Sequence, residues 1–327
     1  MSFPRAARTL LSSTRRYSTA PSGASKSSNL PLYLGGAGIA GLAGYLYLQS
    51  GSKAAAATPA QTQTKTPLDP ERYIDLELKA IRPYNHNTAH FDFALPDNQA
   101  SLLPVASCVL VQTAGDGLAI QDNKGQPVHR PYTPVSPSDA PGVFTLLVKR
   151  YEEGKMSKHI HDLKPGDKLA IKGPIMKIPY KANEFDQIGM IAGGSGITPM
   201  YQVLQHALRD PANKTKFTLI FANVAERDIL YREQFDALQK AHPNTFSVVY
   251  ALDKPDAGWT GAKGYVNREL ITKHIAPASL GDKVKVFICG PPGQVASLAG
   301  KKDGMQQGAL GGVLKELRYT ENQVFKF

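Results

Sequence analysis

A glycine-rich run at residues 188–200, IGMIAGGSGITPM, constrains the fold of this 327-residue chain more than any other stretch. Its apolar beginning is typical of a buried strand, and it ends at glycines that permit a sharp turn or the close approach of a ligand. The proline at its end suits the first turn of a helix, whose unpaired N–H groups favour an anion. The run therefore predicts either a structural turn or a phosphate-binding site.

Five residues of this run would face a ligand in the second interpretation: Gly193, Gly194, Gly196, Thr198 and Pro199. Their spacing departs from the dinucleotide fingerprint G-x-G-x-x-G, because Pro199 stands where the last glycine is expected. A lone glycine turn after a strand is a weak signal. Other stretches must decide between the two interpretations.

Positive charge is concentrated at the start of the chain. The formal net charge is +11, and residues 1–68 contain seven Lys and Arg but no acidic residue, which leaves 11 − 7 = +4 for the rest. This nearly balanced body argues against nucleic acid as its partner. Residues 1–29 are rich in Arg and Ser, which is typical of a mitochondrial targeting presequence.

The next segments predict an anchor and a tether. Residues 30–50 are mostly apolar and lie in a window without charge, and they are long enough to cross a bilayer once as a helix. A sorting segment that is cleaved off is the alternative. Residues 51–68 are dominated by Ala, Thr, Gln and Pro without apolar periodicity, so we expect a flexible linker between the membrane and the body.

The cysteines and histidines show no metal-binding pattern. Cys108 and Cys289 are the two cysteines, and they lie far apart without a C-x-x-C motif. The eight histidines form no ligand cluster. We expect neither a disulfide framework nor a metal site.

Residues 69–180 read as an antiparallel β-barrel domain. Short alternating segments are separated by Pro, Gly, Asn and Asp, with one short helix at residues 157–163, and this pattern favours closely connected strands. The expected strands are residues 73–81, 88–95, 107–114, 127–136, 143–151 and 168–173.

One of these strands contains an unusual cluster, RPYTPVS, with Arg130, Pro131, Tyr132, Thr133 and Ser136. The prolines block a continuous ladder, so we expect an edge strand. Such an edge offers a guanidinium to a phosphate, a phenol ring to a flat heterocycle and a hydroxyl to a ring nitrogen. The alternative is a proline-broken edge strand with a charged surface.

A second anion-binding candidate follows at GKMS, which comprises Gly154, Lys155, Met156 and Ser157. We expect Ser157 to cap the short helix, so that the free N–H groups can receive phosphate oxygens. Alone, this motif predicts no more than a helix cap.

Residues 185–327 alternate strand and helix, which predicts a parallel sheet with helices on both faces and ligands at the carboxyl ends of the strands. The expected strands are residues 188–192, 217–222, 246–252 and 284–289. The expected helices are residues 199–209, 229–240, 267–274 and 310–317.

The motifs RPYTPVS, LLVKRY, GKMS and GMIAGGSGITPM occur in an order that resembles the ferredoxin-NADP reductase superfamily, and within it the NADH-cytochrome b5 reductases. The resemblance covers residues 69–327. It implies an FAD-binding β-barrel domain at residues 69–180 and an NADH-binding α/β domain at residues 185–327.

The resemblance also implies roles for single residues on the FAD side. Arg130 would hold the pyrophosphate, Tyr132 would pack on the flavin, and Thr133 would approach its reactive edge. The remaining FAD-binding candidates are Pro131, Ser136, Lys149, Tyr151, Gly154, Lys155, Met156 and Ser157, and His86 falls at a family position near the flavin.

On the NADH side, Asp253 would accept a hydrogen bond from the ribose and repel the 2′-phosphate of NADPH, although Arg227 could receive that phosphate and Asp253 could be a turn residue. Cys289, Gly290 and Pro291 would lie beside the nicotinamide, and the terminal Phe327 would lie near both rings. The catalytic candidates are Thr133, Lys149 and Cys289, the last as a pocket-shaping thiol rather than a nucleophile. The family commonly has a third proline where this chain has Gly293, so the geometry after it is left open.

The implied activity is hydride transfer from NADH to FAD, followed by single-electron transfer to cytochrome b5. Lys155, Lys158 and Lys181 are candidates for meeting the acidic face of that partner, with solvated surface lysines as the alternative, and the catalytic body is expected to be monomeric. One alternative is a reductase for an iron–sulfur protein or oxygenase. The other is a membrane-tethered, flavin-free nucleotide-binding or scaffold protein. Resemblance to fungal mitochondrial members implies the outer membrane, with the intermembrane space as a second location.

Overall fold

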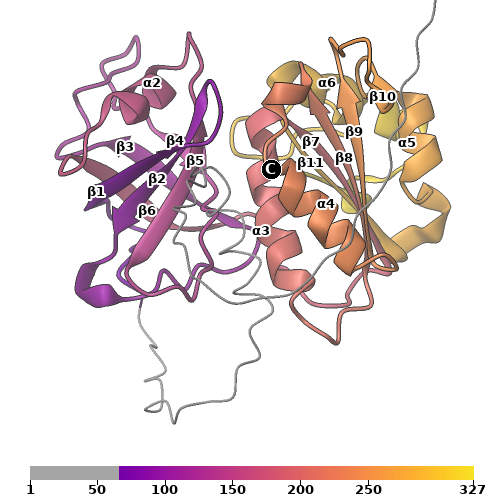
Figure 1. The fold of residues 1–327 in the computed structure, drawn as a ribbon, viewed down its shortest axis with the longest axis horizontal. Coiled ribbons are helices and arrows are strands. Elements are labelled where there is room, and N and C mark those ends of the chain that lie inside the picture. Colours follow the sequence, from indigo (N-terminus) through magenta and orange to yellow (C-terminus); the bar gives the residue numbers. More distant parts are fainter. Residues whose placement is uncertain (1–65) are drawn as a thin grey trace, which may run out of the picture. The chain divides into compact units, whose positions relative to one another are not determined.

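The computed structural model describes residues 66–327. The expectations for residues 1–29, 30–50 and most of 51–68 fall outside the described residues. Within residues 66–327, no helix is both long enough and apolar enough to cross a membrane. These residues lie in one compact unit, which has an N-terminal and a C-terminal lobe (Figure 1).

Alternating side chains build the N-terminal lobe. In β1, Leu76 and Leu78 are buried while Glu77 and Lys79 face outward, which is the period of a half-buried strand. The strands are β1 (Ile74–Pro83), β2 (Thr88–Ala94), β3 (Ser107–Thr113), β4 (Arg130–Tyr132), β5 (Val143–Lys149) and β6 (Lys168–Met176), with helices η1 (Pro96–Asn98) and α2 (Lys155–Asp162).

These strands form a six-stranded antiparallel sheet in the order β4-β3-β6-β1-β2-β5. Beyond β4, the N–H of Val135 donates to the carbonyl of Thr145 in β5 at 2.9 Å, so the two ends of the sheet approach each other. Phe91, Phe93 and Phe144 fill the interior. The expected antiparallel sheet of this domain is confirmed.

The expected strand at residues 127–136 is much shorter in the structure. Only Arg130–Tyr132 pair with β3. Pro131 and Pro134 have no N–H to donate, which prevents a long ladder here. The short helix also begins earlier than expected, at Lys155.

The C-terminal lobe is a parallel six-stranded sheet in the order β10-β9-β8-β7-β11-β12. Its strands are β7 (Gln187–Gly193), β8 (Lys216–Asn223), β9 (Phe246–Leu252), β10 (Ala262–Lys263), β11 (Val284–Cys289) and β12 (Val324–Lys326). Its helices are η2 (Gly194–Gly196), α3 (Ile197–Ala207), η3 (Glu226–Asp228), α4 (Arg232–Ala241), α5 (Arg268–His274), η4 (Ala278–Lys283), α6 (Pro292–Ala299), α7 (Gly312–Glu316) and η5 (Glu321–Gln323).

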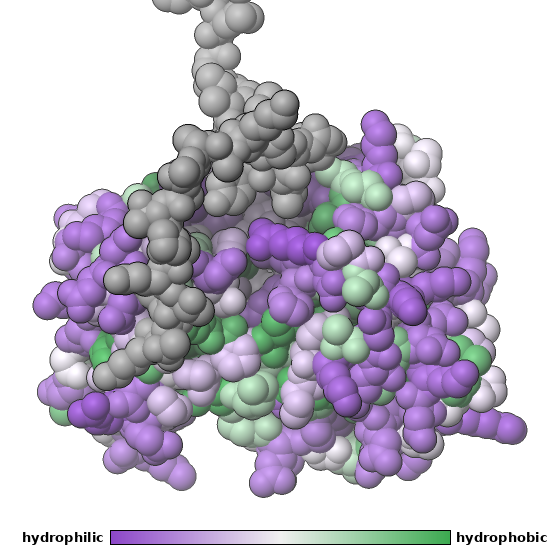
Figure 2. Space-filling view, turned by 90° about the horizontal axis from the view of Figure 1, so that it is seen from below, coloured by the Kyte–Doolittle hydropathy of each residue, from purple (hydrophilic) through white to green (hydrophobic). Residues whose placement is uncertain are grey.

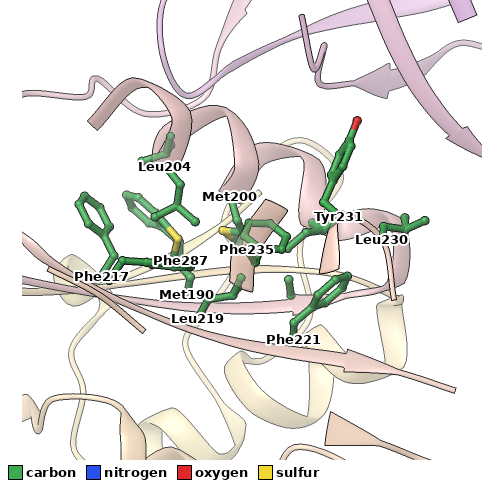
Figure 3. Close-up of a cluster of buried hydrophobic side chains, with 14 of the residues drawn as sticks. Met190, Met200, Leu204, Phe217, Leu219, Phe221, Leu230, Tyr231, Phe235 and Phe287 are labelled. Carbon is green, nitrogen blue, oxygen red and sulfur yellow. The ribbon is translucent and has the colours of Figure 1, made fainter. Parts of the chain in front are cut away.

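Successive residues of the central strands serve opposite faces of this sheet. Met190 packs with Met200 and Leu204 of α3 and with Phe235 of α4, as the close-up shows (Figure 3). Ile191, the next residue, packs instead in the cluster that α5, α6 and α7 cover. The strands are therefore apolar on both sides, as buried parallel strands are, and the predicted two-layered helix cover is confirmed.

Among the elements of this lobe that differ from the prediction are α4, α6 and β12. α4 begins at Arg232 rather than at residue 229, because η3 and the left-handed backbone of Tyr231 (φ 57°) precede it. α6 occupies residues that the sequence left without a helix, and Pro292 suits its first turn. The last residues form β12, which pairs with β11 and extends the sheet.

The face drawn in Figure 2 is mostly hydrophilic. Figure 2 shows one face on which hydrophilic side chains predominate and smaller hydrophobic groups lie between them. Most large apolar side chains are instead in the three buried clusters.

Candidate functional site

Arg130 presents a free positive charge at the edge of the N-terminal lobe. It is exposed on β4, opposite Val111 of β3, and its Nη1 donates to the carbonyl of His129 at 2.8 Å. Among the described residues no carboxylate lies within ion-pair distance of it. A guanidinium left in this state is available to a phosphate group.

The residues after Arg130 differ in exposure. Pro131 is exposed, and Tyr132 packs against the interior of the barrel, where burial raises the pKa of its phenol. Thr133 follows the strand and is half-buried. Tyr132 and Thr133, both half-buried, therefore remain partly accessible next to Arg130 in the chain.

Ser136 is engaged elsewhere. Its Oγ accepts the N–H of Thr145 at 3.0 Å. It also lines a cavity of about 430 Å³ together with residues of α3 such as Gln202 and Gln205. Its hydroxyl therefore has a structural role in holding the segment to β5, and a contact with FAD stays a prediction.

The start of α2 is arranged differently from the prediction. Gly154, not Ser157, is the N-cap residue, and the helix begins at Lys155. The Oγ of Ser157 donates to the carbonyl of Gly154 at 3.0 Å and accepts the N–H of Tyr151 at 3.1 Å, so it folds the preceding turn. The predicted cap was therefore wrong, but the first N–H groups of the helix still lack intrahelical partners.

Side chains at this helix start point in different directions. Met156 is buried in the barrel core, so only its backbone can meet a ligand. The Nζ of Lys155 is exposed and donates to the carbonyl of Gln121 at 3.1 Å. A side chain at Gly154 would strike Tyr151, with 3.0 Å between a Cβ there and that of the tyrosine.

Lys149 forms an ion pair that the sequence did not predict. Its Nζ lies 3.1 Å from Oδ1 of Asp228, and both side chains are nearly buried. The Nε2 of His86 lies 3.6 Å from the same oxygen, and Oδ2 accepts the N–H of Ala225. Asp228 thus connects β5 and the β1–β2 turn of one lobe to the segment after β8 of the other.

Tyr151 brings the two sequence motifs together. This side chain follows β5, is exposed, and its hydroxyl lies 2.7 Å from Oγ of Ser195 in the glycine-rich turn. One residue expected to line FAD therefore contacts the turn expected to bind NADH.

The glycine-rich turn closes against the end of β11. Gly194 has a positive φ of 50°, and a Cβ at Gly196 would lie 2.7 Å from the N of Gly290. At Gly193, a Cβ would lie 2.8 Å from Cδ of Pro291. The turn therefore requires glycine for its backbone packing, as well as for any ligand that approaches it.

α3 begins directly after this turn, at Ile197. Thr198 and Pro199 lie in its first turn and are buried, and Thr198 Oγ1 donates to the carbonyl of Ser195 at 3.3 Å. The helix start and the three glycines thus form a continuous backbone surface.

The ends of β8 and β9 contribute polar groups. The N–H of Asp253 donates to the carbonyl of Asn223 at 3.0 Å, and burial raises the pKa of the Asp253 carboxyl. Asn223 is buried, and neither atom of its amide has a hydrogen-bond partner in the described part of the chain. An orphaned amide at the carboxyl edge of a parallel sheet is a mark of a polar ligand site.

Cys289 ends β11 next to the glycine-rich turn. Burial raises the pKa of its thiol to about 11, although Lys302 and Lys177 act in the opposite direction. A neutral thiol at physiological pH is a poor nucleophile, which agrees with the predicted pocket-shaping role. Gly290 packs on Gly193, and Pro291 precedes α6.

The chain end lies beside the same strand. Phe327 donates its N–H to the carbonyl of Ile288 at 2.9 Å, and its ring contacts those of Phe287 and Phe325. β12 therefore places the terminal aromatic residue beside Ile288, the residue of β11 that precedes Cys289.

Three residues of this region were missed in the sequence. Asn223 ends β8, Asp228 follows that strand, and Tyr265 follows β10 with 78% of its surface exposed. The position of Asn223 at a strand end was a usable signal. The partner of Asp228 was not, because Lys149 is 79 residues away.

The residues present fit FAD and a nicotinamide dinucleotide. Arg130 and the free N–H groups of α2 supply an anion site, and the glycines at the end of β7 form a second backbone cradle that a Cβ would fill. The unpartnered Asn223 amide lies at the sheet edge where dinucleotides bind.

Comparisons with known proteins agree with this arrangement. Residues 75–180 match the family model described as oxidoreductase FAD-binding domain, and residues 190–299 match the oxidoreductase NAD-binding domain. NADH-cytochrome b5 reductase 2 of Mycosarcoma maydis is 45% identical over 96% of this chain and 93% of its own length. The protein of the same name from Botryotinia fuckeliana is 42% identical over 99% and 98%.

A solved structure shows the same architecture. The cytochrome b5 reductase domain of Ulva prolifera nitrate reductase is 28% identical and superposes with a TM-score of 0.69, covering 80% of this chain and all of that one. Together with the nearly full-length relatives, this structure shows that the chain shares sequence as well as fold with these proteins over both lobes. The chain belongs to the NADH-cytochrome b5 reductase family of FAD- and NAD-binding oxidoreductases.

Proposed function

We propose that this chain is an oxidoreductase that uses NADH to reduce a bound FAD and delivers single electrons to cytochrome b5. When bound, FAD supplies the chemistry that accepts a hydride and releases the two electrons one at a time. The protein contributes binding, orientation and the exclusion of water. The names of the relatives support the acceptor.

The hydrogen bond between Tyr151 and Ser195 carries this proposal. It connects the segment between β5 and α2 to the glycine-rich turn between β7 and α3. An enzyme that passes hydride between two cofactors needs their sites to adjoin, because transfer requires contact of the reacting atoms.

On the FAD side, Arg130 and the N–H groups at the start of α2 would hold the diphosphate. Tyr132 and Thr133 would meet the ring system with one aromatic face and one hydroxyl. Lys149, which is paired with Asp228, would act as a fixed charge at the junction of the lobes.

On the NADH side, the backbone of Gly193, Gly194 and Gly196 would hold the diphosphate at the start of α3. Cys289 and Phe327 would shape the nicotinamide pocket, with the thiol neutral because burial raises its pKa. Asp253 would accept from the adenosine ribose, and the exposed ring of Tyr265, which follows the strand paired with β9, offers a stacking surface for the base.

An anaerobic titration tests the activity. NADH should bleach the flavin absorbance of the purified holoenzyme, NADPH should do so more slowly, and added cytochrome b5 should then be reduced. Bleaching without haem reduction, together with rapid reduction of a ferredoxin, would favour the alternative of a reductase for an iron–sulfur partner. A colourless protein that binds NADH would contradict the proposal.

Arg130→Ala tests the FAD site. Losing a charge-assisted hydrogen bond to phosphate costs about 1.5–3 kcal/mol, so FAD affinity should fall roughly 10- to 150-fold. The measurement is the ratio of flavin to protein absorbance after gel filtration. Arg72→Ala is the control, since Arg72 is an exposed arginine paired with Asp69, and equal retention in both variants would count against the assignment.

We also propose that residues 1–29 direct the chain to mitochondria and that residues 30–50 anchor it in the outer membrane. The Arg- and Ser-rich composition without acids and the uncharged apolar run support this. Protease protection and carbonate extraction of isolated mitochondria test it. Release of a shortened form into the intermembrane space would instead support cleavage of the segment.

A further inference from the structure

A lysine next to the chain end is almost fully buried. Lys326 of β12 has 2% of its surface exposed. Its Nζ lies 3.1–3.5 Å from five main-chain carbonyl oxygens, those of Ala299, Gly300, Lys301, Gly308 and Ala309. Within residues 66–327, no carboxylate lies within ion-pair distance of this nitrogen. A shell of acceptors alone suits an ammonium group, which has three N–H donors and no acceptor.

Most of these carbonyls depend on Lys326 for a hydrogen bond. The carbonyl of Ala299 also accepts the N–H of Gly311 at 3.0 Å. The other four carbonyls of the shell accept no further hydrogen bond from the part of the chain that the structure describes. Without the ammonium they would have to bond to water instead, which favours opening of the loop that carries them.

The ammonium joins the two ends of the loop between α6 and α7. Ala299 and Gly300 are at the C-terminus of α6, where the last carbonyls lack intrahelical partners and attract a cation. A Cβ built on Gly300 would lie 2.6 Å from the carbonyl oxygen of Ala309, so the two ends of the loop are in close contact. Lys326 therefore closes residues 300–309 at their base.

Gln307 of this loop holds the main chain of the same lysine. The N–H of Lys326 donates to Oε1 of Gln307 at 2.7 Å, and Nε2 of Gln307 donates to the carbonyl of Lys326 at 3.0 Å. β12 is the last strand of its sheet, so this side-chain amide occupies the free edge where a further strand would pair. The loop and the terminal strand thus restrain each other through one residue.

Successive residues of β12 face opposite sides of the sheet. Val324 packs in the cluster that α5, α6 and α7 cover, and Lys326 reaches the end of α6. Phe325 and Phe327 instead contact Phe287 in the cluster on the other side. An ammonium anchored on one side of the sheet therefore restrains the terminal ring on the other side.

Both elements that Lys326 restrains border the proposed nicotinamide pocket. Phe327 is bonded to the carbonyl of Ile288, the residue before Cys289. α6, whose last carbonyls bond to Lys326, begins at Pro292, directly after the turn that follows Cys289. A shift of the lysine would therefore be passed to two sides of that pocket.

We infer that Lys326 is a positioning residue for hydride transfer, whose buried ammonium keeps the terminal ring and the start of α6 in the geometry that the nicotinamide requires. This inference rests on the proposed function and adds a residue that acts through Phe327. Misplacement of a reacting group by about 1 Å can cost about 100-fold in rate, so a small displacement of the pocket is enough to be measured.

The test removes the ammonium and keeps the length of the side chain. In the full-length holoenzyme, Lys326→Met retains an unbranched apolar stem and loses the three donors. Lys315→Met, at an exposed position of α7, is its control. Gln307→Met removes the amide on the edge of β12, and Gln306→Met, at the exposed neighbouring position, is the matched control for that change.

Three measurements distinguish positioning from stability alone. Amide hydrogen exchange of residues 300–310 should be faster in Lys326→Met than in the wild type. The limiting rate constant of flavin bleaching at saturating NADH should fall about 5- to 50-fold. The inhibition constant of ADP, which carries the diphosphate and the adenosine but no nicotinamide, should stay within about twofold of the wild-type value. Gln307→Met should change exchange and bleaching in the same direction by less, and both controls should match the wild type.

Each other outcome assigns the lysine differently. Faster exchange with unchanged bleaching would show that Lys326 only stabilises the loop, and would overturn the inference. So would a rise of the ADP inhibition constant as large as the loss of bleaching, because the whole NADH site would then be affected. If Lys326→Met yields no folded holoenzyme, Gln307→Met against Gln306→Met decides by the same measurements. Failure of NADH to bleach the wild type would overturn the proposed function, while hydrogen exchange would still report the contact of Lys326 with the loop.

Discussion

We expect single residues at strand ends to decide which nucleotide the C-terminal lobe favours. Asp253 follows β9 and is held by the hydrogen bond from its N–H to Asn223. Its side chain is half-buried, and this burial raises the pKa of its carboxyl. A carboxylate in such a place accepts well from a hydroxyl and repels a phosphate.

Asp253→Thr should therefore weaken the preference for NADH. The ratio of kcat/KM for NADPH to that for NADH should rise about 10- to 100-fold, which corresponds to removing about 1.4–2.8 kcal/mol of repulsion. Steady-state kinetics with both nucleotides measure this ratio. Asp256→Thr, at an exposed position of the same turn, serves as control, and an unchanged ratio at Asp253 would contradict the assignment.

For single residues, sequence motifs predicted positions in the fold better than they predicted side-chain contacts. Arg130, Cys289 and the glycines could be placed from the sequence because each is tied to a strand end or a turn. The predicted capping role of Ser157 was wrong. Its hydroxyl could bond either to the N–H groups at the helix start or to the backbone of the preceding turn, and the sequence does not distinguish these two partners. The Lys149–Asp228 pair could not be foreseen, since no local signal joins residues so distant in sequence.

Two glycines at neighbouring elements show how differently the same residue can be constrained. Gly196 ends η2, and a Cβ there would meet the backbone of Cys289 and Gly290, which cannot rotate away. Gly293 lies in α6, and nothing stands within 4 Å of a Cβ built on it. One position is limited by close packing and the other is not.

Gly196→Ala should lower stability and weaken NADH binding, while Gly293→Ala should not. Overpacking against backbone costs about 1–3 kcal/mol. Alanine in place of helical glycine gains up to about 1 kcal/mol, which raises Tm by about 2–4 °C in a chain of this size. Thermal unfolding and NADH titration of both variants check this, and similar Tm values for the two would refute the packing argument.

Elements with a strong apolar period were predictable, and those without one were not. The alternation in β1 and the continuous apolar runs of β7 and β11 identified their strands. α6 was missed because Gly293 and small residues dilute its apolar face, although Val295, Leu298 and Ala299 are buried. β12 has three residues, and its existence depends on pairing with β11.

At the scale of the whole molecule, the two lobes meet at an interface, here called the joint, that contains polar as well as apolar contacts. His90 of β2 has Nε2 2.8 Å from the hydroxyl of Tyr231, and Tyr84 accepts the N–H of Tyr231 at 2.6 Å. Tyr201 of α3 stacks on the Tyr231 ring with 4.3 Å between centroids. Figure 3 shows the Tyr231 hydroxyl pointing away from the labelled apolar cluster. Tyr231 thus joins the core of one lobe to a strand of the other.

This joint should make the molecule sensitive to acid through His90. Burial, and then repulsion from Arg82, lower the pKa of the His90 imidazole to about 4. In the unfolded chain an ordinary histidine has a pKa of about 6.5. Between these values the unfolded state binds a proton that the folded state does not, so the free energy of unfolding falls as the pH drops from about 6.5 to 4.

His90→Gln removes this titration and retains a polar side chain. Relative to the wild type, the variant should lose up to about 3 kcal/mol less of its free energy of unfolding between pH 7 and pH 4, because each pKa unit corresponds to about 1.36 kcal/mol. Denaturant unfolding at both pH values measures the difference. His129→Gln, at an exposed position, should keep the acid sensitivity of the wild type. If His90→Gln keeps it too, the histidine is protonated in the folded joint, and the contact with Tyr231 tolerates the charge.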